Sequence, residues 1–412
     1  MPNHSWLLHL ALSRYLAFVT RLNVVPFYPE LMERFGVTYA GAGALYTAFF
    51  VGYALSLIPA GAAADRGRPA RQLAVGLAVA GAAGAVLSLT GSFAAALAAR
   101  VVQGLAVALM YTAVLKVVAV EFSQQHRGRA VGLMEQATGL GMLTALTFAP
   151  LLSTWVAARW LLLSQAGMCA LALILLLQAP PTRPGRPTAP GAAATRPGPG
   201  EARPLPPLRN LFGRDLALIT LTVMLGLFAA NGLLAWLPAH LVDGLGHSKA
   251  AAGLITGLIL AGQVLGVYPA GTLSDRLGRR LPVVHAGTAL LIAGFTGLLV
   301  VQGGWALYVL AVILGVGMAW AVTPMVILST EFFGPERAGL ASSITIAFGQ
   351  AAAGLTGVVF GWVLDQTGNF NAIWISAALV AALRFPGMLA IREQRKWAEP
   401  PDHPAGTPRA GA

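Results

Sequence analysis

Six charged side chains interrupt long apolar runs of this sequence, and their types and positions could support chemistry. They are five cations and one carboxylate: Arg14, Arg21, Arg100, Lys116, Arg384 and Glu135. A charge inside a membrane-spanning run is costly to bury, so such residues are candidates for a functional site. An excess of positive charge attracts anions and repels cations. The set therefore predicts a site for an anionic or zwitterionic small molecule, with Glu135 as a candidate proton carrier.

Arg21 is the leading candidate for contact with an anion. It lies about fifteen residues into its apolar run, or ~22 Å at 1.5 Å per helical residue. Asn23 follows, and Pro26 and Pro29 predict a kink in the outer part of this helix. The alternatives for Arg21 are a structural pair or a side chain that reaches toward the membrane surface.

The other intramembrane charges have alternative explanations as well. Arg100 lies a few residues inside its run, so it could instead anchor the outer surface. Lys116 and Glu135 are predicted to pair with each other, because burying either one alone would be costly. Arg384, beside Phe385 and Pro386, is predicted to be structural.

Polar and aromatic side chains within the runs complete the candidate substrate site. We predict substrate contacts for Arg21, Asn23, Arg100, Gln136, Asn231 and Trp320. Further cavity-lining candidates are Tyr46, Tyr53, Gln263, Thr323 and Gln350. Packing between helices is the alternative explanation for each uncharged member. Proton coupling is assigned to Glu135 or Arg100.

The elements that carry these residues are apolar helices. The chain is 57% hydrophobic and only 10% charged, whereas soluble domains carry about 25% charged residues. A membrane span needs ~20 mostly apolar residues. Twelve such runs occur, at roughly 6–27, 40–63, 73–90, 95–119, 130–152, 160–178, 215–237, 250–270, 282–301, 305–328, 339–362 and 371–391. The predicted fold class is an all-α membrane protein with twelve transmembrane helices.

The basic residues predict the orientation. If both termini are cytoplasmic, the cytoplasmic segments hold 19 of the 27 basic residues and the opposite side holds three. This satisfies the positive-inside rule. The formal net charge of +12 therefore needs no nucleic-acid partner. We predict a multi-pass protein of the bacterial inner (plasma) membrane. The N-terminus is interpreted as the first span, because a signal peptide would have a basic start.

Composition divides the chain into four parts. Residues 179–214 are dense in Pro, Gly and Arg, which predicts a flexible cytoplasmic linker. A bundle of six helices at 1–178 precedes it and a second at 215–391 follows it. The polar tail 392–412 is predicted to be disordered.

The two predicted bundles share a repeated sequence. GYALSLIPAGAAADR at 52–66 returns as GQVLGVYPAGTLSDR at 262–276, a shift of 210 residues. Glu121 and Arg127 return as Glu331 and Arg337 at the same shift. Such a duplication predicts two pseudo-symmetric six-helix bundles in parallel orientation, with a binding site between them.

The end of each repeat carries a motif. Gly271–Arg280, GTLSDRLGRR, fits the pattern G-x-x-x-D-R-x-G-R-R. A glycine lets a neighbouring helix approach closely, and the aspartate can face the positive N-terminus of another helix. Residues of the second copy are Gly271, Asp275, Arg276, Gly278, Arg279 and Arg280; the first copy keeps Gly61, Asp65 and Arg66 and then departs.

With its twelve spans and central linker, this twice-repeated motif resembles the major facilitator superfamily. The resemblance implies a monomeric two-bundle transporter with alternating access, latched on the cytoplasmic side when it is open outward. Asp65 and Arg66 would then face the start of span eleven near Arg337, and Asp275 and Arg276 the start of span five near Arg127. Glu121 and Glu331 would complete this ionic network.

Two shorter elements resemble branches of that family. TRLN, at 20–23, is similar to the R-x-N element of the anion:cation symporters, in which the arginine meets the substrate anion. Thr20 stands where that branch usually has an acid. RVVQG, at 100–104, resembles an R-x-x-x-G element tied to proton coupling. Span five has Ala145 and Leu146 where many drug/proton antiporters have a Gly-Pro pair.

The sequence favours a secondary transporter driven by a proton or ion gradient. It has no phosphate-binding loop for ATP, and His9, His240 and His285 are scattered, which disfavours a membrane enzyme. The lone Cys169 can form neither an internal disulfide nor a cysteine metal cluster, and no metal or cofactor is predicted. The alternatives are proton-coupled efflux of a drug or metabolite and, more remotely, a solute sensor that does not transport.

Overall fold

The computed structural model describes residues 4–66, 68–122, 124–178, 213–331, 338–391 and 393, and all regular secondary structure within them is helical. The first half contains α1 (His4–Leu22), η1 (Val25–Phe27), α2 (Tyr28–Phe35), α3 (Tyr39–Arg66), α4 (Pro69–Leu89), α5 (Phe93–Glu121), α6 (Gln124–Leu143), η2 (Thr144–Phe148), α7 (Ala149–Leu152) and α8 (Ala158–Leu177). The second half contains α9 (Arg214–Ala239), η4 (His240–Gly244), α10 (Lys249–Leu277), α11 (Leu281–Gly297), α12 (Gly304–Glu331), α13 (Ala338–Thr367), α14 (Phe370–Ala382) and α15 (Arg384–Ala390).

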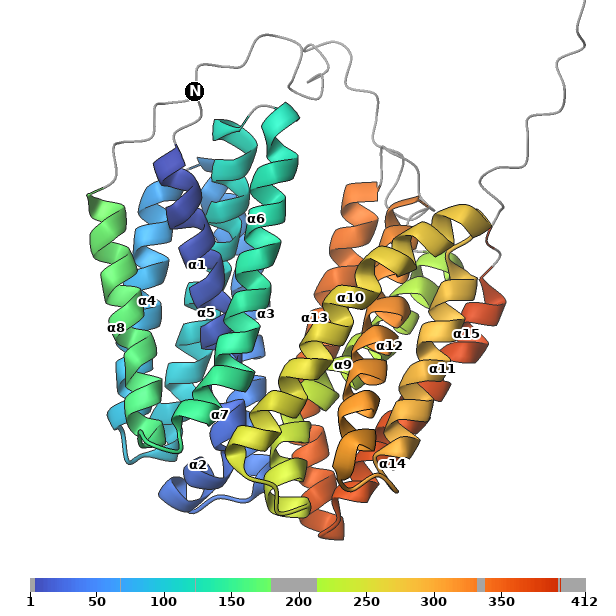
Figure 1. The fold of residues 1–412 in the computed structure, drawn as a ribbon. Coiled ribbons are helices and arrows are strands. Elements are labelled where there is room, and N and C mark those ends of the chain that lie inside the picture. The colour runs from blue at the N-terminus through green and yellow to red at the C-terminus, as the bar shows by residue number, and fades with distance from the viewer. Residues whose placement is uncertain are drawn as a thin grey trace, which may run out of the picture.

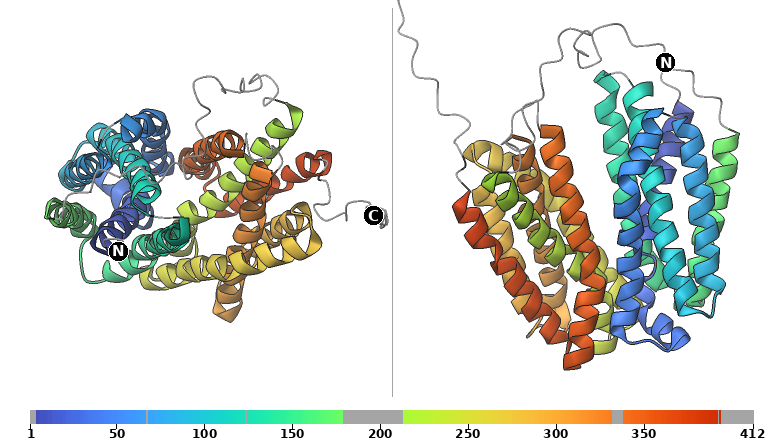
Figure 2. Two further views of the ribbon diagram at one scale, coloured as in Figure 1. Left: turned by 90° about the horizontal axis from the view of Figure 1, so that it is seen from above. Right: turned by 180° about the vertical axis from the view of Figure 1, so that it is seen from behind.

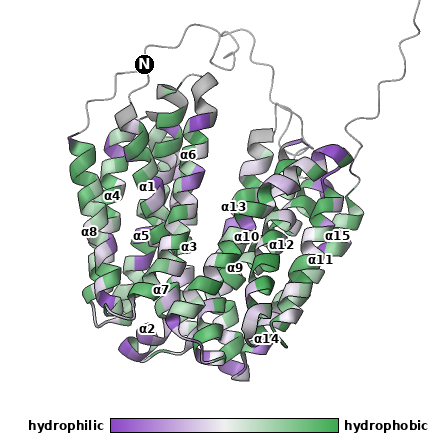
Figure 3. Ribbon diagram, viewed as in Figure 1, coloured by the Kyte–Doolittle hydropathy of each residue, from purple (hydrophilic) through white to green (hydrophobic). Residues whose placement is uncertain are grey.

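Each of the twelve apolar runs coincides with helix in the described residues. Nine of the helices found there are long and apolar enough to cross a membrane, and α11 is a shorter apolar helix. Hydrophobic residues cover most of their length (Figure 3). The predicted all-α membrane fold is therefore confirmed.

Prolines explain where runs depart from a single helix. The predicted kink after Arg21 is a complete break: α1 ends at Leu22, and a short 3-10 turn leads into α2. Pro26 has no N–H to donate to the carbonyl of Leu22. Run 130–152 changes to a π-helical segment, η2, just before Pro150, and the last run is divided into α14 and α15 near Pro386.

The helices form two groups, α1–α8 and α9–α15. These groups lie against each other at one end and diverge toward the other (Figures 1 and 2). We call the end at which α8 finishes and α9 begins the linker end, and the opposite end the α2 end.

Glycines permit the tightest contact between the two groups, where α3 crosses α13. A Cβ on Gly43 would lie 2.0 Å from the carbonyl oxygen of Gly357, and a Cβ on Gly357 would lie 2.3 Å from that of Gly43. A second contact joins α10 to η2, where a Cβ on Gly257 would lie 2.7 Å from Thr147 Oγ1. Both contacts therefore depend on the absence of a side chain at glycine.

The predicted linker and tail lie outside the described residues, apart from Gly213, Arg214 and Glu393. Glu393 is the one residue of the predicted tail 392–412 that the structure describes. Its side chain is only 6% exposed, and its carboxylate accepts hydrogen bonds from the backbone N–H groups of Arg280 and Leu281. Glu393 therefore binds the free N–H groups at the start of α11.

Candidate substrate site and gates

Arg21 lies where the two bundles meet. Its Nη2 donates to Asn231 Oδ1 of α9 at 2.8 Å, and the Tyr46 hydroxyl lies 3.3 Å from the same oxygen. Asn231 Nδ2 donates to the carbonyl of Leu227 at 2.9 Å, which orients the amide. The Arg21 guanidinium also lies 4.6 Å from the centre of the Phe50 ring, within range of a cation–π contact. A cation of one bundle is thus bound by a neutral amide of the other.

Arg21 and Asn231 occupy corresponding positions of the duplicated unit. They are separated by 210 residues, the shift that relates the two sequence repeats. Corresponding positions meet when they lie near the axis that relates the two bundles. This contact therefore marks the place where a ligand could touch both bundles at once.

Arg100 is buried and fixes the end of α1. Its guanidinium donates to the carbonyls of Thr20 at 2.7 Å and Arg21 at 3.0 Å, which the break after Leu22 leaves without helical partners. Its other acceptors are the carbonyl of Leu45, Asn23 Oδ1 and Gln103 Oε1. Because Arg100 is 0% exposed, the alternative of a surface anchor is wrong. All three of its guanidinium nitrogens have acceptors, so Arg100 positions Arg21 in this conformation.

The remaining predicted contact residues are placed differently. Asn23 is buried against Arg100. Gln136 is exposed on α6, and Trp320 Nε1 donates to the carbonyl of Gly266 at 3.1 Å within the second bundle. Within the described residues, neither Gln136 nor Trp320 forms a hydrogen bond to Arg21 or to the residues that bind it. The structure thus brings together Arg21, Asn23, Arg100 and Asn231.

The predicted pair of Lys116 and Glu135 is wrong. Lys116 Nζ lies 2.7 Å from Asp65 Oδ1, and Arg14 Nη2 lies 3.3 Å from Glu135 Oε1. The reason is the order of packing: α5 lies along α3, which carries Asp65, whereas α6 lies along α1, which carries Arg14. Each cation therefore pairs with the acid of the helix beside it.

Arg14 and Arg21 are connected through an aromatic side chain. The guanidinium groups of Arg14 and Arg21 lie 5.1 Å and 5.5 Å from the Phe18 ring centre, and that of Arg14 lies 4.7 Å from the Tyr111 ring centre. The Arg14 side chain is 13% exposed, but that of Glu135 is 63% exposed. The carboxylate that neutralises Arg14 is therefore accessible.

Arg384 is structural, as the sequence predicted. It is buried and donates to the carbonyl of Thr222 at 3.1 Å, to Thr288 Oγ1 at 2.8 Å and to the carbonyl of Ala321 at 2.6 Å. These acceptors belong to α9, α11 and α12, so one side chain connects four helices of the second bundle.

A set of polar contacts joins the bundles at the α2 end. Lys249 of α10 forms an ion pair with Glu30 of α2. Asp365 of α13 accepts hydrogen bonds from the backbone N–H groups of Tyr39 and Ala40, at 3.0 and 2.9 Å. Farther along α3, Thr47 Oγ1 donates to the carbonyl of Gly354 at 2.7 Å and accepts from the N–H of Val358 at 3.2 Å. We call these contacts the outer gate, because the α2 end is the outer side in the orientation that the sequence predicts.

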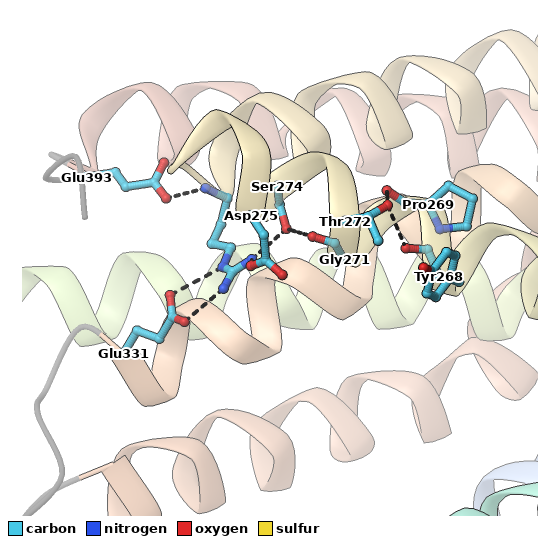
Figure 4. Close-up of polar contacts among 9 residues, drawn as sticks. Tyr268, Pro269, Gly271, Thr272, Ser274, Asp275, Glu331 and Glu393 are labelled. Carbon is cyan, nitrogen blue, oxygen red and sulfur yellow. Dashed lines mark hydrogen bonds and ion pairs between the residues drawn. The ribbon is translucent and has the colours of Figure 1, made fainter. Parts of the chain in front are cut away.

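The second copy of the motif forms its contacts within its own bundle at the linker end (Figure 4). Arg280 binds Glu331 at 2.9 Å and Asp275 at 2.5 Å, and the hydrogen bond to Glu331 raises its pKa above the ordinary arginine value. Arg279 lies 3.9 Å from Glu393, and Arg276 is exposed. Gly278, at φ +60°, ends α10 in the left-handed conformation that favours glycine.

The close approach expected at the motif glycines is absent from this conformation. No described atom lies within 4 Å of a Cβ placed on Gly61 or Gly271. Arg337 lies outside the described residues, as do the side chains of Arg66, Glu121 and Arg127. In the described part of the chain, the ion pairs of Asp65, Asp275 and Glu331 stay within one bundle.

Sequence reasoning missed the outer gate and Glu393. Glu30, Lys249 and Asp365 lie beyond the ends of the apolar runs, where a charged side chain carries no burial cost that would single it out. One signal was available: Asp365 follows the run 339–362, at the C-terminal end of a helix, where the helix dipole disfavours a carboxylate. An acid in that position suggests a partner elsewhere.

Two bundles of apolar helices that meet at one end, with a cation at their contact, form an arrangement typical of membrane transporters. The chain belongs to the Major Facilitator Superfamily, whose sequence profile matches residues 10–259 and 216–411. The members that it resembles are membrane transporters rather than enzymes.

Relatives and solved structures agree with that assignment. The chain is 31% identical over 363 residues to a "Chloramphenicol resistance protein" of Streptomyces lividans, covering 86% of this chain and 88% of that protein. It is 26% identical to a "Probable sulfoacetate transporter" of Cupriavidus necator, covering 90% of each. A bacterial homologue of the lysosomal transporter Spinster, inward-facing and occupied, has a TM-score of 0.74, 17% identity and coverage of 95% and 94%. A D-xylose-proton symporter has a TM-score of 0.72, 18% identity and coverage of 96% and 99%.

Proposed function

We propose that this protein is a secondary active transporter of a small organic anion or zwitterion, coupled to a proton or ion gradient. The observation that carries the proposal is Arg21, a cation at the contact of the two bundles. In the described part of the chain no carboxylate forms an ion pair with it, and its hydrogen-bond partner is the neutral amide of Asn231. An acidic ligand would supply the missing negative charge.

A carboxylate or sulfonate can displace Asn231 from Arg21. Charge-assisted hydrogen bonds are roughly twice as strong as neutral ones, and guanidinium can bind an oxyanion through two parallel bonds. Because Asn231 belongs to the second bundle, displacing it changes a contact between the bundles. Substrate occupancy would thereby bias the conformational equilibrium. The relative named for sulfoacetate, an organic anion, supports this substrate class.

We assign proton coupling to the Arg14–Glu135 pair. Protonation of Glu135 would remove the charge that neutralises Arg14 and release a second cation on α1. Arg14 lies seven residues from Arg21, or ~10 Å along the helix, and Phe18 lies between them. A proton on Glu135 would thus favour an anion in the site. Binding of the two together is what a symporter requires.

We propose a multi-pass monomer in the bacterial inner membrane, and the positive-inside charge distribution supports an orientation with both termini cytoplasmic. The linker end is then the cytoplasmic side. Since the bundles are in contact at the α2 end, this orientation makes the structure inward-facing. The repeated motif would act as the gate of the opposite, outward-open state.

Efflux is the second candidate, because the relative that is 31% identical confers chloramphenicol resistance by its name. Efflux of a compound such as chloramphenicol would require recognition of a neutral aromatic molecule rather than an anion. The two functions differ in their substrates and in whether the substrate crosses the membrane in the same direction as the proton or in the opposite direction.

Uptake into vesicles containing the purified protein tests the proposal. We expect an imposed pH gradient to drive accumulation of a labelled carboxylate or sulfonate, with sulfoacetate and short dicarboxylates as first probes and chloramphenicol as the efflux probe. Arg21→Gln should abolish uptake, and Arg21→Lys should retain a fraction of it. Arg159→Gln is the matched control, since Arg159 is exposed on α8 and its guanidinium lies over the Trp160 ring rather than against Arg21. Normal anion uptake by Arg21→Gln would refute the assignment of the site.

A further inference from the structure

We propose that α3 and α13 act as a reciprocal pair, in which an aspartate near the C-terminal end of each helix binds the N-terminus of the other in opposite states of the cycle. Asp365 makes this contact at the α2 end in the present structure. The inference rests on the two-state cycle of the proposed function but on neither its substrate nor its coupling ion.

The N-terminus of α3 depends on the other bundle for its capping group. The first N–H groups of a helix have no partner within it. Asp365 Oδ1 and Oδ2 accept hydrogen bonds from Tyr39 and Ala40, the first two residues of α3, at 3.0 and 2.9 Å. Thr38, which precedes α3, makes no side-chain hydrogen bond within the described residues. One carboxylate thus serves as an N-cap supplied by α13.

The duplicated helix shows that this arrangement is specific to α3. Lys249 begins α10 at the position corresponding to Tyr39, and Ser248 corresponds to Thr38. Ser248 caps its own helix by accepting from the N–H of Ala251 at 3.2 Å. The position corresponding to Asp365 in the first bundle is Trp155, which is 76% exposed. The contact between Asp365 and the N-terminus of α3 therefore has no counterpart at the corresponding positions of the repeat.

The electrostatics of the two helix ends stabilise the Asp365 carboxylate only in the conformation in which the bundles meet at the α2 end. Asp365 lies two residues before the end of α13, where the negative end of that helix opposes its charge. The positive N-terminus of α3 removes this penalty only while the outer gate is closed. When the bundles separate at this end, Asp365 and the α3 N-terminus both lose their partner.

Asp65 occupies the mirrored position on α3. It lies one residue before the end of that helix, at the linker end, and is bound to Lys116 of its own bundle at 2.7 Å. The motif resemblance described above implies that Asp65 faces the start of span eleven, here α13, in the outward-open state. Asp365 would therefore cap the N-terminus of α3 in one state, and Asp65 would cap the N-terminus of α13 in the other.

Distances between spin labels at the α2 end of the full-length protein test the exchange. Gly91→Cys and Gln302→Cys, in loops of the two bundles, would carry the labels in a Cys169→Ala background, in lipid vesicles without substrate or gradient. Asp365→Ala should increase the population with a separated α2 end by about 3- to 10-fold, as expected for loss of an N-cap. Asp65→Ala should decrease that population, and the double variant should return toward wild type.

Two further variants separate the effect of the Asp365 contact from a general loss of folding. Thr38→Asp leaves α13 intact and gives α3 a cap of its own, so it should also favour separation by competing with Asp365. Glu33→Ala is the control, because Glu33 is exposed on the neighbouring α2 and makes no ion pair within the described residues. The proposal is overturned if Asp365→Ala and Asp65→Ala shift the distances in the same direction, or if Asp365→Ala behaves like Glu33→Ala. Failure of the anion site would leave these distances unaffected.

Discussion

Substitution of Gly43 by alanine should open the outer gate. The added Cβ would lie 2.0 Å from the carbonyl oxygen and 2.4 Å from the carbonyl carbon of Gly357, and backbone atoms cannot rotate away as a side chain can. An ordinary contact needs roughly 3.5 Å, so α3 and α13 must separate by more than about 1 Å. The hydrogen bond from Thr47 to Gly354, at 2.7 Å, and that from Tyr39 to Asp365, at 3.0 Å, would then be stretched beyond bonding distance.

The magnitude follows from these losses. Overpacking costs ~1–3 kcal/mol, and each lost hydrogen bond costs about 0.5–1.5 kcal/mol. A total of about 3 kcal/mol corresponds to a shift of ~100-fold toward separated bundles, since 1.4 kcal/mol is a factor of ten. Only the closed outer gate contains this clash, so the fold of each bundle should be preserved.

Label-to-label distances at the α2 end provide the assay, with two glycine controls. Gly167→Ala lies on α8 where a Cβ meets no described atom within 4 Å, and it should match wild type. Gly52→Ala would place a Cβ 1.9 Å from the carbonyl of Val101 within the first bundle, so it should lower thermal stability instead. A Gly43→Ala protein that folds and keeps wild-type distances would refute the reasoning.

Three other substitutions probe the remaining contacts. Arg100→Gln should destabilise the first bundle by several kcal/mol, because it leaves the buried carbonyls of Thr20 and Arg21 unpaired; a wild-type melting temperature would contradict this. Glu135→Gln should keep anion binding but prevent an imposed pH gradient from driving accumulation, because the Arg14–Glu135 pair loses its carboxylate; gradient-driven uptake equal to wild type would remove Glu135 from coupling. Glu393→Gln should lower thermal stability by about 1 kcal/mol through loss of charge at the start of α11, whereas truncation just after Glu393 should not; equal effects of both changes would argue against this contact.

The sequence predicted the fold well because its signals are local. An apolar run of sufficient length becomes a helix wherever it lies in a membrane, and Pro26 and Pro29 disrupt a helix through their own geometry. The 210-residue repeat predicted the pseudo-symmetry that brings Arg21 to Asn231, although their contact itself appeared only in the structure.

Partners of charged residues were less predictable. Both Asp65 and Glu135 lie toward the same end of the chain's helices as Lys116, and their spacing in sequence does not reveal which helix lies beside α5. The role of Arg100 depends on carbonyls freed by a helix break three spans earlier in the sequence. Asp365 binds backbone N–H groups rather than a side chain, so no pairing of residue types could have indicated its partner.

The assignment of Arg21 as an anion site can be tested most directly by ligand-induced stabilisation of the purified protein. A panel of carboxylates, sulfonates, neutral sugars, cationic dyes and chloramphenicol would be compared by melting temperature in wild type, Arg21→Gln and Arg159→Gln. We expect stabilisation of wild type and Arg159→Gln by one or more anions, with none in Arg21→Gln. Stabilisation by neutral or cationic compounds alone, or an anion effect that persists without Arg21, would contradict the account.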